Sequence, residues 1–444
     1  MGMFMHLSLQ IHYDGNWHQA GTLELRDEAL GYRGAAVVDY DLEYYVEAAS
    51  QDFSKGQAVR DRRALSVRYP VDLENRYSRH WPAFLLDLMP QGHARRKLAD
   101  HLGLDETSRQ ADIPLLLRAS SSGIGNLRIK EAAVAESNRL QGVERRGVTE
   151  QAIFERSDLF LEVVDRFGML ASGSSGLQGE WPKVSMTQAQ DGLYYPDGFV
   201  ADDEAVRHVI VKLLRSRDPA DQLILEGEAL YSRIATEIGL NVLEPSQYAN
   251  GVLVIPRFDR QSDQNGTVVR LGQESLVSAI GVSEFGHIGD HETYIEALRE
   301  FSSDPFSDIA EYMKRDIANL ALGNPDNHGR NSALSKHSDG RIRLSPLFDF
   351  APMRLATEGI VRSTRWAAMR DQHSDYLPDW QRISALLFPD DDDYRRLLKE
   401  LQQFAARLRH APEIAKEMGA KPDILDRAMA RCTEISDSVL AISE

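Results

Sequence analysis

The densest group of polar residues in the chain is the segment GNPDNHGRN, residues 323–331. Asp326 and Asn331 in this segment are five residues apart, and Asp349 follows later, directly before a phenylalanine. Phosphoryl transfer needs one carboxylate that accepts or orients the proton of the attacking hydroxyl, and an amide and a second carboxylate that hold Mg²⁺ against the phosphates. The three residues repeat the kinase pattern of Asp-x-x-x-x-Asn followed by a metal-binding Asp-Phe. The alternative is a polar turn that caps the preceding helix-like run, since Asn, Asp and Gly are common turn residues.

The sequence between Asn331 and Asp349 predicts a β-hairpin. The segment SALSKH is followed by the turn residues Ser-Asp-Gly at 338–340 and then by RIRLS. Asp-Gly between two alternating runs is a hairpin signal. Because a hairpin brings its two ends together, Asn331 and Asp349 are expected to lie close although 18 residues separate them.

A kinase also needs a lysine that contacts the nucleotide phosphates, and Lys212 in the strand-like run VRHVIVKLL is the candidate. Alternation places it on the same face as His208 and Ile210. A lysine buried in an apolar strand requires a charged partner, which Glu226 or Glu228 in the following helix could supply. The alternative is a lysine on an edge strand that points into solvent.

A glycine- and serine-rich segment, SGSSGLQGEWPKV at 172–184, precedes this strand. The backbone N–H groups of such a loop can surround phosphates. The segment matches neither the P-loop nor the G-x-G-x-x-G pattern. A flexible linker is therefore the alternative interpretation.

Composition and charge narrow the function classes. The chain has 444 residues, of which 42% are hydrophobic and 27% charged, as in ordinary soluble globular proteins. A net charge of −17 argues against a broad basic face for nucleic-acid binding. Cys432 is the only cysteine, which excludes an intrachain disulfide and a cysteine-based metal site and fits a reducing compartment. The sequence has no cationic leader and no apolar run of 18 residues, so we expect a cytoplasmic protein without a membrane span.

The sequence pattern of the first part of the chain predicts mainly strands. Residues 1–70 contain short alternating runs, with a turn at Asp14-Gly15. Residues 81–102 look helical, with a break at Pro90-Gln91-Gly92.

The later part of the chain becomes helical. A strand at 206–214, a helix at about 222–238 closed by Gly239, and a strand at 252–260 follow one another. Beyond about residue 270 the periodicity is mostly helical, interrupted by the hairpin. A strand-rich first half and a helix-rich second half predict an α+β fold with two lobes and a cleft between them.

The order of these segments resembles the HipA family of bacterial toxin kinases. The most specific match is the segment from Asn324 to Asn331, which is similar to the family pattern Asp-x-His-x-(Lys/Arg)-Asn. Further matches are VIPRFDR (254–260), RLGQESLVSAIG (270–281), LSPLFDF (344–350), EALYSRIATEIGL (228–240), FLLDLMPQGHARRKLADHLGL (84–104) and GIGNLRI (123–129). Together these segments cover most of the chain.

The resemblance implies a two-lobed protein-kinase-like fold, with an N-terminal subdomain at 1–140, a strand-rich N-lobe at 141–256 and a helical C-lobe at 257–444. It implies transfer of the γ-phosphate of ATP, with Mg²⁺, to serine or threonine of a protein. Known substrates in the family include aminoacyl-tRNA synthetases, whose modification halts translation and growth. Many members pair with a small helix-turn-helix antitoxin that neutralises them and represses their operon, so DNA is expected only through the antitoxin.

The resemblance also implies individual roles. Asp326 is expected to be the catalytic base, Asn331 and Asp349 the Mg²⁺ ligands, and Lys212 a contact to the nucleotide phosphates. The stretch 254–258 would be the hinge near adenine. The further residues expected to bind the nucleotide are Gly176, Gln178, Lys183, Arg257, Phe258, His328 and Arg330.

Ser172, Ser174 and Ser175 in the glycine-rich segment are candidates for autophosphorylation, because in the HipA family a serine of this loop can be modified, after which the loop leaves the nucleotide site. A phosphoserine carries about −1.5 to −2 charge at neutral pH and would be repelled by the ATP phosphates. The alternative is that these serines only fill a flexible loop.

The chain departs from the family pattern in two places. The family loop usually reads Ser-Gly-x-Gln-x-Lys, whereas here Gly179-Glu180-Trp181 lengthens the stretch between Gln178 and Lys183. The hinge often reads Glu-Arg-Phe-Asp-Arg, whereas Pro256 stands where the glutamate is expected. Backbone contacts to adenine are compatible with proline at this position, whereas a contact from a glutamate side chain is not possible.

Two other function classes compete with the kinase interpretation. The first is a catalytically weak scaffold in an antitoxin–DNA complex, which would not need Asp326, Asn331 and Asp349 together. The second is a small-molecule phosphotransferase, which uses the same Asp-x-x-x-x-Asn chemistry. Labelled ATP with a cell extract and mass spectrometry would separate the three.

Overall fold

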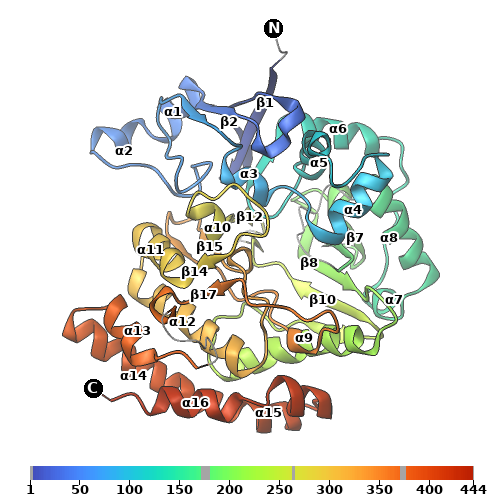
Figure 1. Cartoon of the computed structure of the whole chain (residues 1–444). Coiled ribbons are helices and arrows are strands. Elements are labelled where there is room, and N and C mark those ends of the chain that lie inside the picture. Colours follow the sequence, from blue (N-terminus) through green and yellow to red (C-terminus); the bar gives the residue numbers. More distant parts are fainter. Residues whose placement is uncertain (1–3, 172–180, 263–265, 371–376, 444) are drawn as a thin grey trace. The chain divides into compact units, whose positions relative to one another are not determined.

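The computed structural model describes residues 4–171, 181–262, 266–370 and 377–443 (Figure 1). Its contacts divide the chain into two compact units, each assembled from three separate stretches. Unit 1 comprises Met1–Arg215, Val254–Phe285 and Leu334–Ile342, and unit 2 comprises Ser216–Leu253, Gly286–Ala333 and Arg343–Glu444. Each unit contains both helices and strands, as the predicted α+β class requires.

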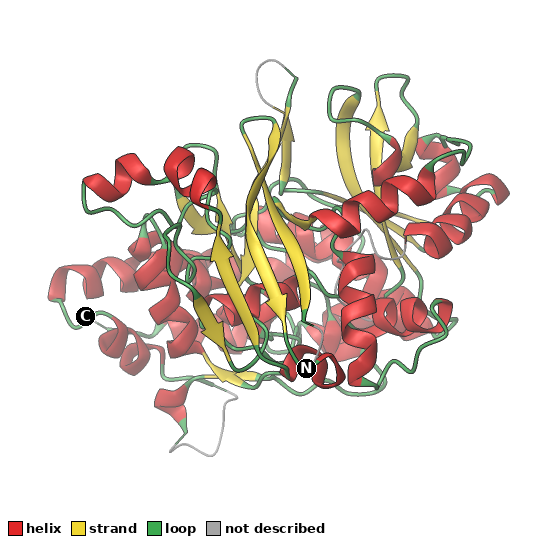
Figure 2. Cartoon of the chain, turned by 90° about the horizontal axis from the view of Figure 1, so that it is seen from above, coloured by secondary structure: helices red, strands yellow, loops and turns green. Residues whose placement is uncertain are grey.

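Unit 1 begins with an antiparallel sheet of strand order β4-β3-β2-β1-β5. The strands are β1 (Met5–Tyr13), β2 (Asn16–Leu25), β3 (Ala36–Tyr40), β4 (Arg76–Ser78) and β5 (Leu127–Ile129). β1 and β2 form the long twisted pair near the N-terminus in Figure 2. The predicted turn at Asp14-Gly15 joins them, and its two residues have φ of 48° and 76°, as a two-residue hairpin turn requires. Leu7, Leu9 and Ile11 alternate along β1 and are buried in the core.

Unit 1 also contains helices. They are α1 (Leu42–Ala48), α2 (Ser50–Ser54), α3 (Ala83–Asp87), α4 (Gly92–His101), α5 (Asp112–Ala119), α6 (Lys130–Leu140), α7 (Glu150–Phe154), α8 (Asp158–Ala171) and α10 (Leu276–Ala279). The predicted helix break at Pro90-Gln91-Gly92 is confirmed, because α3 ends at Asp87 and α4 begins at Gly92. Proline lacks the N–H that a continuing helix would need, and Gly92 has a φ of 53°.

A second sheet of unit 1 contains the predicted strand with Lys212. Its order is β7-β6-β8-β10, formed by β6 (Lys183–Ala189), β7 (Tyr194–Pro196), β8 (Ala205–Leu213) and β10 (Val252–Pro256), and β9 (Gln247–Ala249) of unit 2 pairs with the start of β10. β8 therefore has a neighbour on both sides, and Val209 and Val211 on it are fully buried. The edge-strand alternative for this lysine is thus wrong.

The predicted hairpin after Asn331 is confirmed. β15 (Ala333–Lys336) and β16 (Ile342–Leu344) are neighbours in a sheet of order β13-β15-β16, where β13 is Gly272–Ser275. The His337 N–H donates to the Arg341 carbonyl at 2.8 Å across the turn, and Gly340 has a φ of 85°. Unit 1 also contains the pair β11 (Arg260–Ser262) and β12 (Val268–Arg270).

Unit 2 is mainly helical. Its helices are α9 (Pro219–Glu237), α11 (His291–Phe301), α12 (Pro305–Ala321), α13 (Trp380–Leu387), α14 (Asp391–Leu408), α15 (Ala411–Glu417) and α16 (Cys432–Leu440), with a π-helical turn η7 at Ile424–Ala428. Two short strands, β14 (Gly289–Asp290) and β17 (Thr364–Arg365), pair in parallel. The predicted helix near 222–238 is α9: Asp218 caps it by accepting from the Ala220 N–H at 2.9 Å, and Gly239 beyond its end has a φ of 85°.

Short 3₁₀ turns connect these elements. They are η1 (Glu28–Arg33), η2 (Arg109–Ala111), η3 (Asp197–Phe199), η4 (Gly329–Asn331), η5 (Met353–Leu355) and η6 (Ala367–Met369). The expected domain boundaries after residues 140 and 256 stay predictions, and they differ from the limits of the compact units, which fall after Arg215 and inside β10.

Candidate active site

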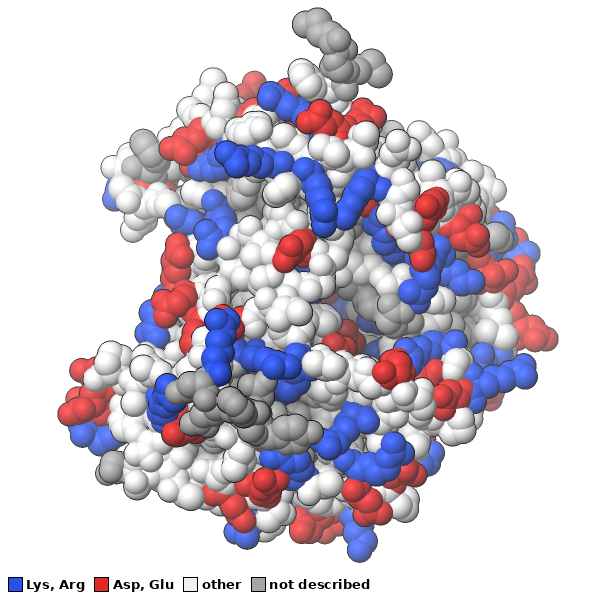
Figure 3. Space-filling view, viewed as in Figure 1, with Lys and Arg blue, Asp and Glu red and all other residues white. Residues whose placement is uncertain are grey.

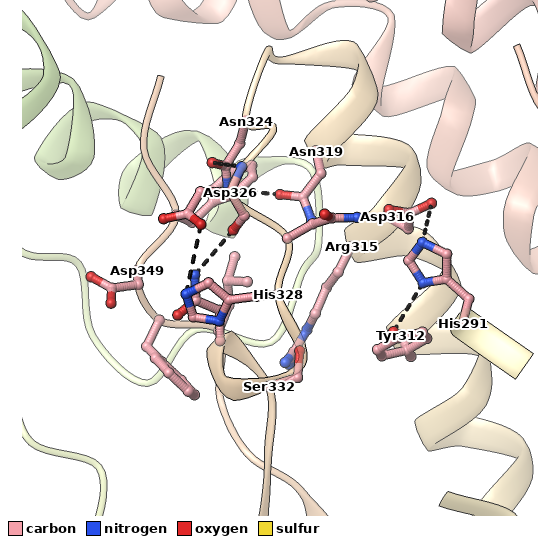
Figure 4. A pocket seen from close by; sticks show the side chains of 15 residues that line it. His291, Tyr312, Arg315, Asp316, Asn319, Asn324, Asp326, His328, Ser332 and Asp349 are labelled. Carbon is pink, nitrogen blue, oxygen red and sulfur yellow. Dashed lines mark hydrogen bonds and ion pairs between the residues drawn. The ribbon is translucent and has the colours of Figure 1, made fainter. Parts of the chain in front are cut away.

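The polar segment singled out in the sequence lines a small pocket of unit 2 (Figure 4). The pocket collects the three predicted chemical groups, Asp326, Asn331 and Asp349. The other lining residues are His291, Tyr312, Arg315, Asp316, Asn319, Asn324, Asn327, His328, Ser332, Leu347, Phe348 and Phe350. Figure 4 shows Asp326 between Asn324 and His328, with Asp349 beside them.

The polar segment follows helix α12 directly in the chain, so the end of this helix sets where the segment lies. The N-terminus of the helix is capped by Asp304, whose carboxylate accepts from the Ser307 N–H at 3.3 Å. Beyond its end, Gly323 has a φ of 69°, and a Cβ added there would lie 2.4 Å from the carbonyl oxygen of Ala428. Only glycine fits this position, where the chain leaves the helix and enters the loop.

Side-chain amides hold the loop around Asp326. Asn324 accepts from the Asp326 N–H at 3.3 Å and donates to Asn319 Oδ1 on α12 at 2.9 Å. Asn331 Nδ2 donates to the Asp326 carbonyl at 3.0 Å. Since the nitrogen of the Asn331 amide faces that carbonyl, its Oδ1 is the atom left to bind a cation.

Asp349 reaches the pocket from the far end of the hairpin. Ser345 N–H donates to the Ala333 carbonyl at 2.8 Å, which closes the hairpin two residues beyond Asn331. The expectation that Asn331 and Asp349 come together is therefore confirmed, since both line the pocket. Asp349 has a φ of 52°, a left-handed conformation that costs a non-glycine residue about 1–3 kcal/mol and is frequent at functional sites.

The oxygen atoms of Asn331 and Asp349 fit the preferences of Mg²⁺. Mg²⁺ binds oxygen ligands and usually combines one or two protein carboxylates with phosphates and water. In the part of the chain that the structure describes, no group of three or more His, Cys, Asp or Glu side chains could hold a metal ion by itself. Phosphate and water oxygens can complete such a ligand set when a nucleotide is bound.

His328 and Arg330 lie differently within the same loop. His328 Nε2 is 3.6 Å from Asp326 Oδ1, and its side chain is 40% exposed. Arg330 is buried, with only 8% of its surface exposed, and does not line the pocket. Their expected contacts to a nucleotide stay predictions.

Lys212 is buried in the second sheet of unit 1. It is 4% exposed, and its Nζ lies 5.4 Å from the centre of the Trp181 ring. Lys183 on β6 is its direct partner across the strand pair. Glu226, one of the two expected partners of Lys212, is bonded instead by Lys421 at 2.6 Å.

Five of the predicted residues lie outside the described residues. They are Gly176, Gln178, Ser172, Ser174 and Ser175, all within 172–180. Phosphate binding and autophosphorylation by this segment therefore stay predictions.

The side chain of Arg257 is engaged in an ion cluster rather than open to a nucleotide. Its guanidinium donates to Asp197 at 2.6 Å and to Asp259 at 2.7 and 2.9 Å, and the residue is 3% exposed. Phe258 is half-buried. The expected adenine hinge at 254–258 stays a prediction.

Sequence reasoning missed several residues of the pocket. Asn319, Asn324 and Asn327 carry the amides around the loop, and Asp316 and His291 lie behind it. Two signals were available in the sequence. The polar segment contains three asparagines, and Asp316 lies on the apolar face of α12. Neither signal shows which residues these side chains form hydrogen bonds with.

Replacement of Asp349 by asparagine tests the strained backbone. Asparagine adopts the left-handed conformation readily, so we expect Asp349→Asn to unfold at the same temperature as the wild type or higher. The loss of one carboxylate should weaken Mg²⁺-dependent nucleotide binding at the same time. Thermal unfolding without nucleotide and calorimetric titration with Mg·ATP measure the two effects. A variant that is less stable but binds Mg·ATP equally well would contradict both expectations.

On the face drawn in Figure 3, Lys and Arg side chains are interspersed with Asp and Glu. Among the described residues, no helix has the length and apolar character needed to cross a membrane.

Comparison with known proteins identifies the family. The model of the HipA-like C-terminal domain matches residues 175–420, more than half of the chain. A protein of Sinorhizobium fredii named "Putative kinase Y4mE" is 28% identical over 300 residues, which cover 64% of this chain and 67% of that protein.

A solved structure supports the same fold. HipA of Shewanella oneidensis, in a complex with HipB and operator DNA, matches 99% of this chain and 100% of its own chain at a TM-score of 0.63 and 16% identity. The kinase CtkA of Helicobacter pylori matches 53% of this chain at a TM-score of 0.34. The expected α+β, kinase-like fold is thus confirmed by the Shewanella structure, and the chain belongs to the HipA family.

Proposed function

We propose that this chain is a HipA-type toxin kinase that transfers the γ-phosphate of ATP to a serine or threonine of a protein substrate. The observation that supports this most is the convergence of Asp326, Asn331 and Asp349 in one pocket. A polar turn that only caps α12 would not need Asp349, which arrives from the end of a hairpin in a strained conformation.

Each of the three residues has a distinct task in the proposed reaction. Asp326 accepts the proton of the attacking hydroxyl, because its half-exposed carboxylate can be reached from the pocket. Asn331 Oδ1 and the Asp349 carboxylate hold Mg²⁺. The ion, when bound, neutralises the charge on the β- and γ-phosphates.

Unit 1 would supply the contacts to the nucleotide. Lys212, buried in the middle of a sheet, is proposed to bind phosphate oxygens, and the backbone at 254–258 to bind adenine. The positive charge of a lysine complements the negative charge of nucleotide phosphates. The glycine-rich segment and its three serines are proposed to cover the phosphates.

A helix-turn-helix antitoxin is the proposed partner. The Shewanella HipA structure contains HipB and operator DNA. The net charge of −17 supports contact with DNA through such a partner rather than directly. A scaffold role in that complex is the competing function, and a small-molecule phosphotransferase is another.

Labelled ATP tests the proposed function. The purified chain is incubated with γ-labelled ATP, Mg²⁺ and a bacterial extract, and phosphorylated species are identified by mass spectrometry. We expect label on serine or threonine of a protein, and none with Asp326→Ala. Label only on small molecules would favour the phosphotransferase, and no label with folded protein would favour the scaffold.

Expression without a partner tests the toxin role. We expect the wild-type chain to slow bacterial growth and Asp326→Ala or Asp349→Ala to relieve this, because both changes remove groups needed for phosphoryl transfer. Growth curves at matched soluble expression are the measurement. Unchanged growth with abundant soluble wild type would contradict the toxin role. It would not bear on kinase activity, which the labelling assay tests separately.

A further inference from the structure

Residues 362–368, called here the brace, are attached to the loop that carries Asp326 and to two helices of unit 2. The brace contains β17 and does not line the pocket. It pairs with β14 in parallel, Gly289 opposite Thr364. The brace therefore forms part of the structural support behind the pocket.

Asn327 joins the loop to the brace. It directly follows Asp326, and its Nδ2 donates to the Thr364 carbonyl at 2.9 Å while its Oδ1 accepts from the Thr364 N–H at 3.3 Å. It is 9% exposed, so water competes little for these bonds. One side chain thus satisfies both backbone groups of a residue 37 positions away.

Asp316 joins α12 to both sides of the same strand. Arg362 donates to its Oδ1 at 2.5 Å, and the Trp366 indole N–H donates to its Oδ2 at 2.9 Å. Asp316 is 2% exposed. Burial alone would raise the pKa of Asp316, but the Arg362 guanidinium outweighs this and holds that pKa below its usual range, so the carboxylate stays ionised at neutral pH.

The end of the brace is held by α11. The two carboxylate oxygens of Glu292 accept from the Ala367 and Ala368 N–H groups at 2.8 and 2.9 Å. His291, the first residue of α11, stacks on the Trp366 ring with 4.5 Å between ring centres. Burial lowers the pKa of His291 to about 4, and Asp316 only partly opposes this, so the ring is neutral at pH 7 and adds no second positive charge.

The loop around Asp326 has little regular structure of its own, and side-chain bonds must therefore fix it. A catalytic group has to be held within about 0.5 Å of its productive position by packing and by bonds from residues that do not touch the substrate. Asn324 and Asn331 bond the backbone of Asp326 itself. Asn327 extends this support outward to the brace.

We propose that Asn327 and Asp316 are positioning residues for Asp326, acting together through the brace. Neither reacts or binds nucleotide in this assignment. Asn327 fixes the loop to Thr364, and Asp316 fixes the brace to α12 through Arg362 and Trp366. The inference rests on the proposed kinase function.

Two nearly isosteric variants disturb the two attachments. In Asn327→Asp, an oxygen replaces the nitrogen that donates to the Thr364 carbonyl, so attraction becomes repulsion. In Asp316→Asn, a nitrogen must face one of two N–H donors, and the charge opposite Arg362 is lost. Asn138→Asp makes the same chemical change as the first variant at an exposed position of α6 and serves as the control.

The first readout is steady-state kinase activity. We expect kcat to fall about 10–100-fold in each variant, the size of effect that residues supporting a reactive centre from behind typically have. KM for ATP should not change, and neither value should change in Asn138→Asp. If both residues act through the brace, the double variant should be no slower than the slower single variant.

The second readout is hydrogen exchange of the backbone amides at 362–368, which needs no activity. Exchange should be faster in Asn327→Asp than in the wild type or Asn138→Asp. Faster exchange with wild-type kcat would refute positioning, as would raised KM with unchanged kcat or fully additive losses of kcat. An inactive wild type would refute the proposed function and this inference with it, whereas active wild type with equally active variants would refute this inference alone.

Discussion

Replacement of Asp326 by asparagine is expected to lower the rate of phosphoryl transfer by about 10²–10⁴-fold, the contribution that a positioned general base usually makes. The amide has the same shape but cannot accept the proton of the attacking hydroxyl. Affinity for ATP should stay near that of the wild type, because a base contacts the hydroxyl and not the nucleotide. Single-turnover kinetics and a calorimetric ATP titration measure the two quantities.

Two comparisons sharpen this prediction. Asp391→Asn, at an exposed position in the first turn of α14, makes the same change away from the pocket and should leave the rate unaltered. Asp349→Ala should weaken Mg·ATP binding in addition to slowing transfer. Equal rates for the wild type and Asp326→Asn would refute the assignment of the base.

Removal of the Asp259 carboxylate is expected to reduce the free energy of unfolding of unit 1 by about 3–5 kcal/mol, the usual cost of breaking a buried ion pair from one side. Asp259 is 2% exposed and accepts from Arg257, from Arg260 at 2.9 Å and from the Gly125 N–H at 2.8 Å. Asp259→Ala would leave two buried guanidinium groups with one carboxylate, Asp197. Chemical denaturation followed by circular dichroism measures the loss.

A surface ion pair of the same unit is the control. Glu204 and Arg145 are 2.7 Å apart with 48% and 34% of their side chains exposed, so Glu204→Ala should cost about 1 kcal/mol or less. A loss for Asp259→Ala no larger than this would show that the cluster does not stabilise unit 1.

The pH dependence of the Asp259 contribution follows from its pKa. Burial opposes ionisation, but Arg257 and Arg260 outweigh it and hold the pKa of Asp259 far below its usual range. A carboxyl whose pKa is lower in the folded state stabilises the fold above its unfolded pKa of about 3.9, and this contribution is lost as the pH falls toward the folded value. The difference between wild type and Asp259→Ala should therefore be constant near neutral pH and shrink only in acid.

Features that depend on neighbours in the sequence were predictable. The Asp-Gly turns at 14–15 and 339–340 lie where the alternating strands require them. The helix break at Pro90 and the end of α9 before Gly239 are likewise confirmed. These signals work because turn and cap conformations are set by one to four adjacent residues.

The burial of Lys212 could not be predicted from its strand. Alternation shows which residues share a face, but it does not show whether the strand lies in the middle of a sheet or at its edge. That depends on β6 and β10, which come from other parts of the chain. The sequence was compatible with an edge strand and with a central strand. The pairing of β8 with both β6 and β10 shows that the strand is central.

The bonding of Arg257 could not be predicted from the local sequence. The family resemblance implied a hinge near the nucleotide at 254–258, which stays a prediction, and the Arg257 side chain is bonded to Asp259 and to Asp197, 60 residues earlier. A buried guanidinium must be neutralised by nearby carboxylates. Which carboxylate lies near is a property of the folded chain.

The sequence by itself determined the identity and order of the candidate reactive groups: a carboxylate, an amide five residues later, and a second carboxylate beyond a hairpin. Spacing suffices for this because a short loop and a tight hairpin restrict where their ends can lie. Only the tertiary structure decided what holds those groups in place. The bonds from Asn327 to Thr364 and from Asp316 to Arg362 and Trp366 join residues 37 to 50 positions apart, and such pairs form only when separate elements pack together.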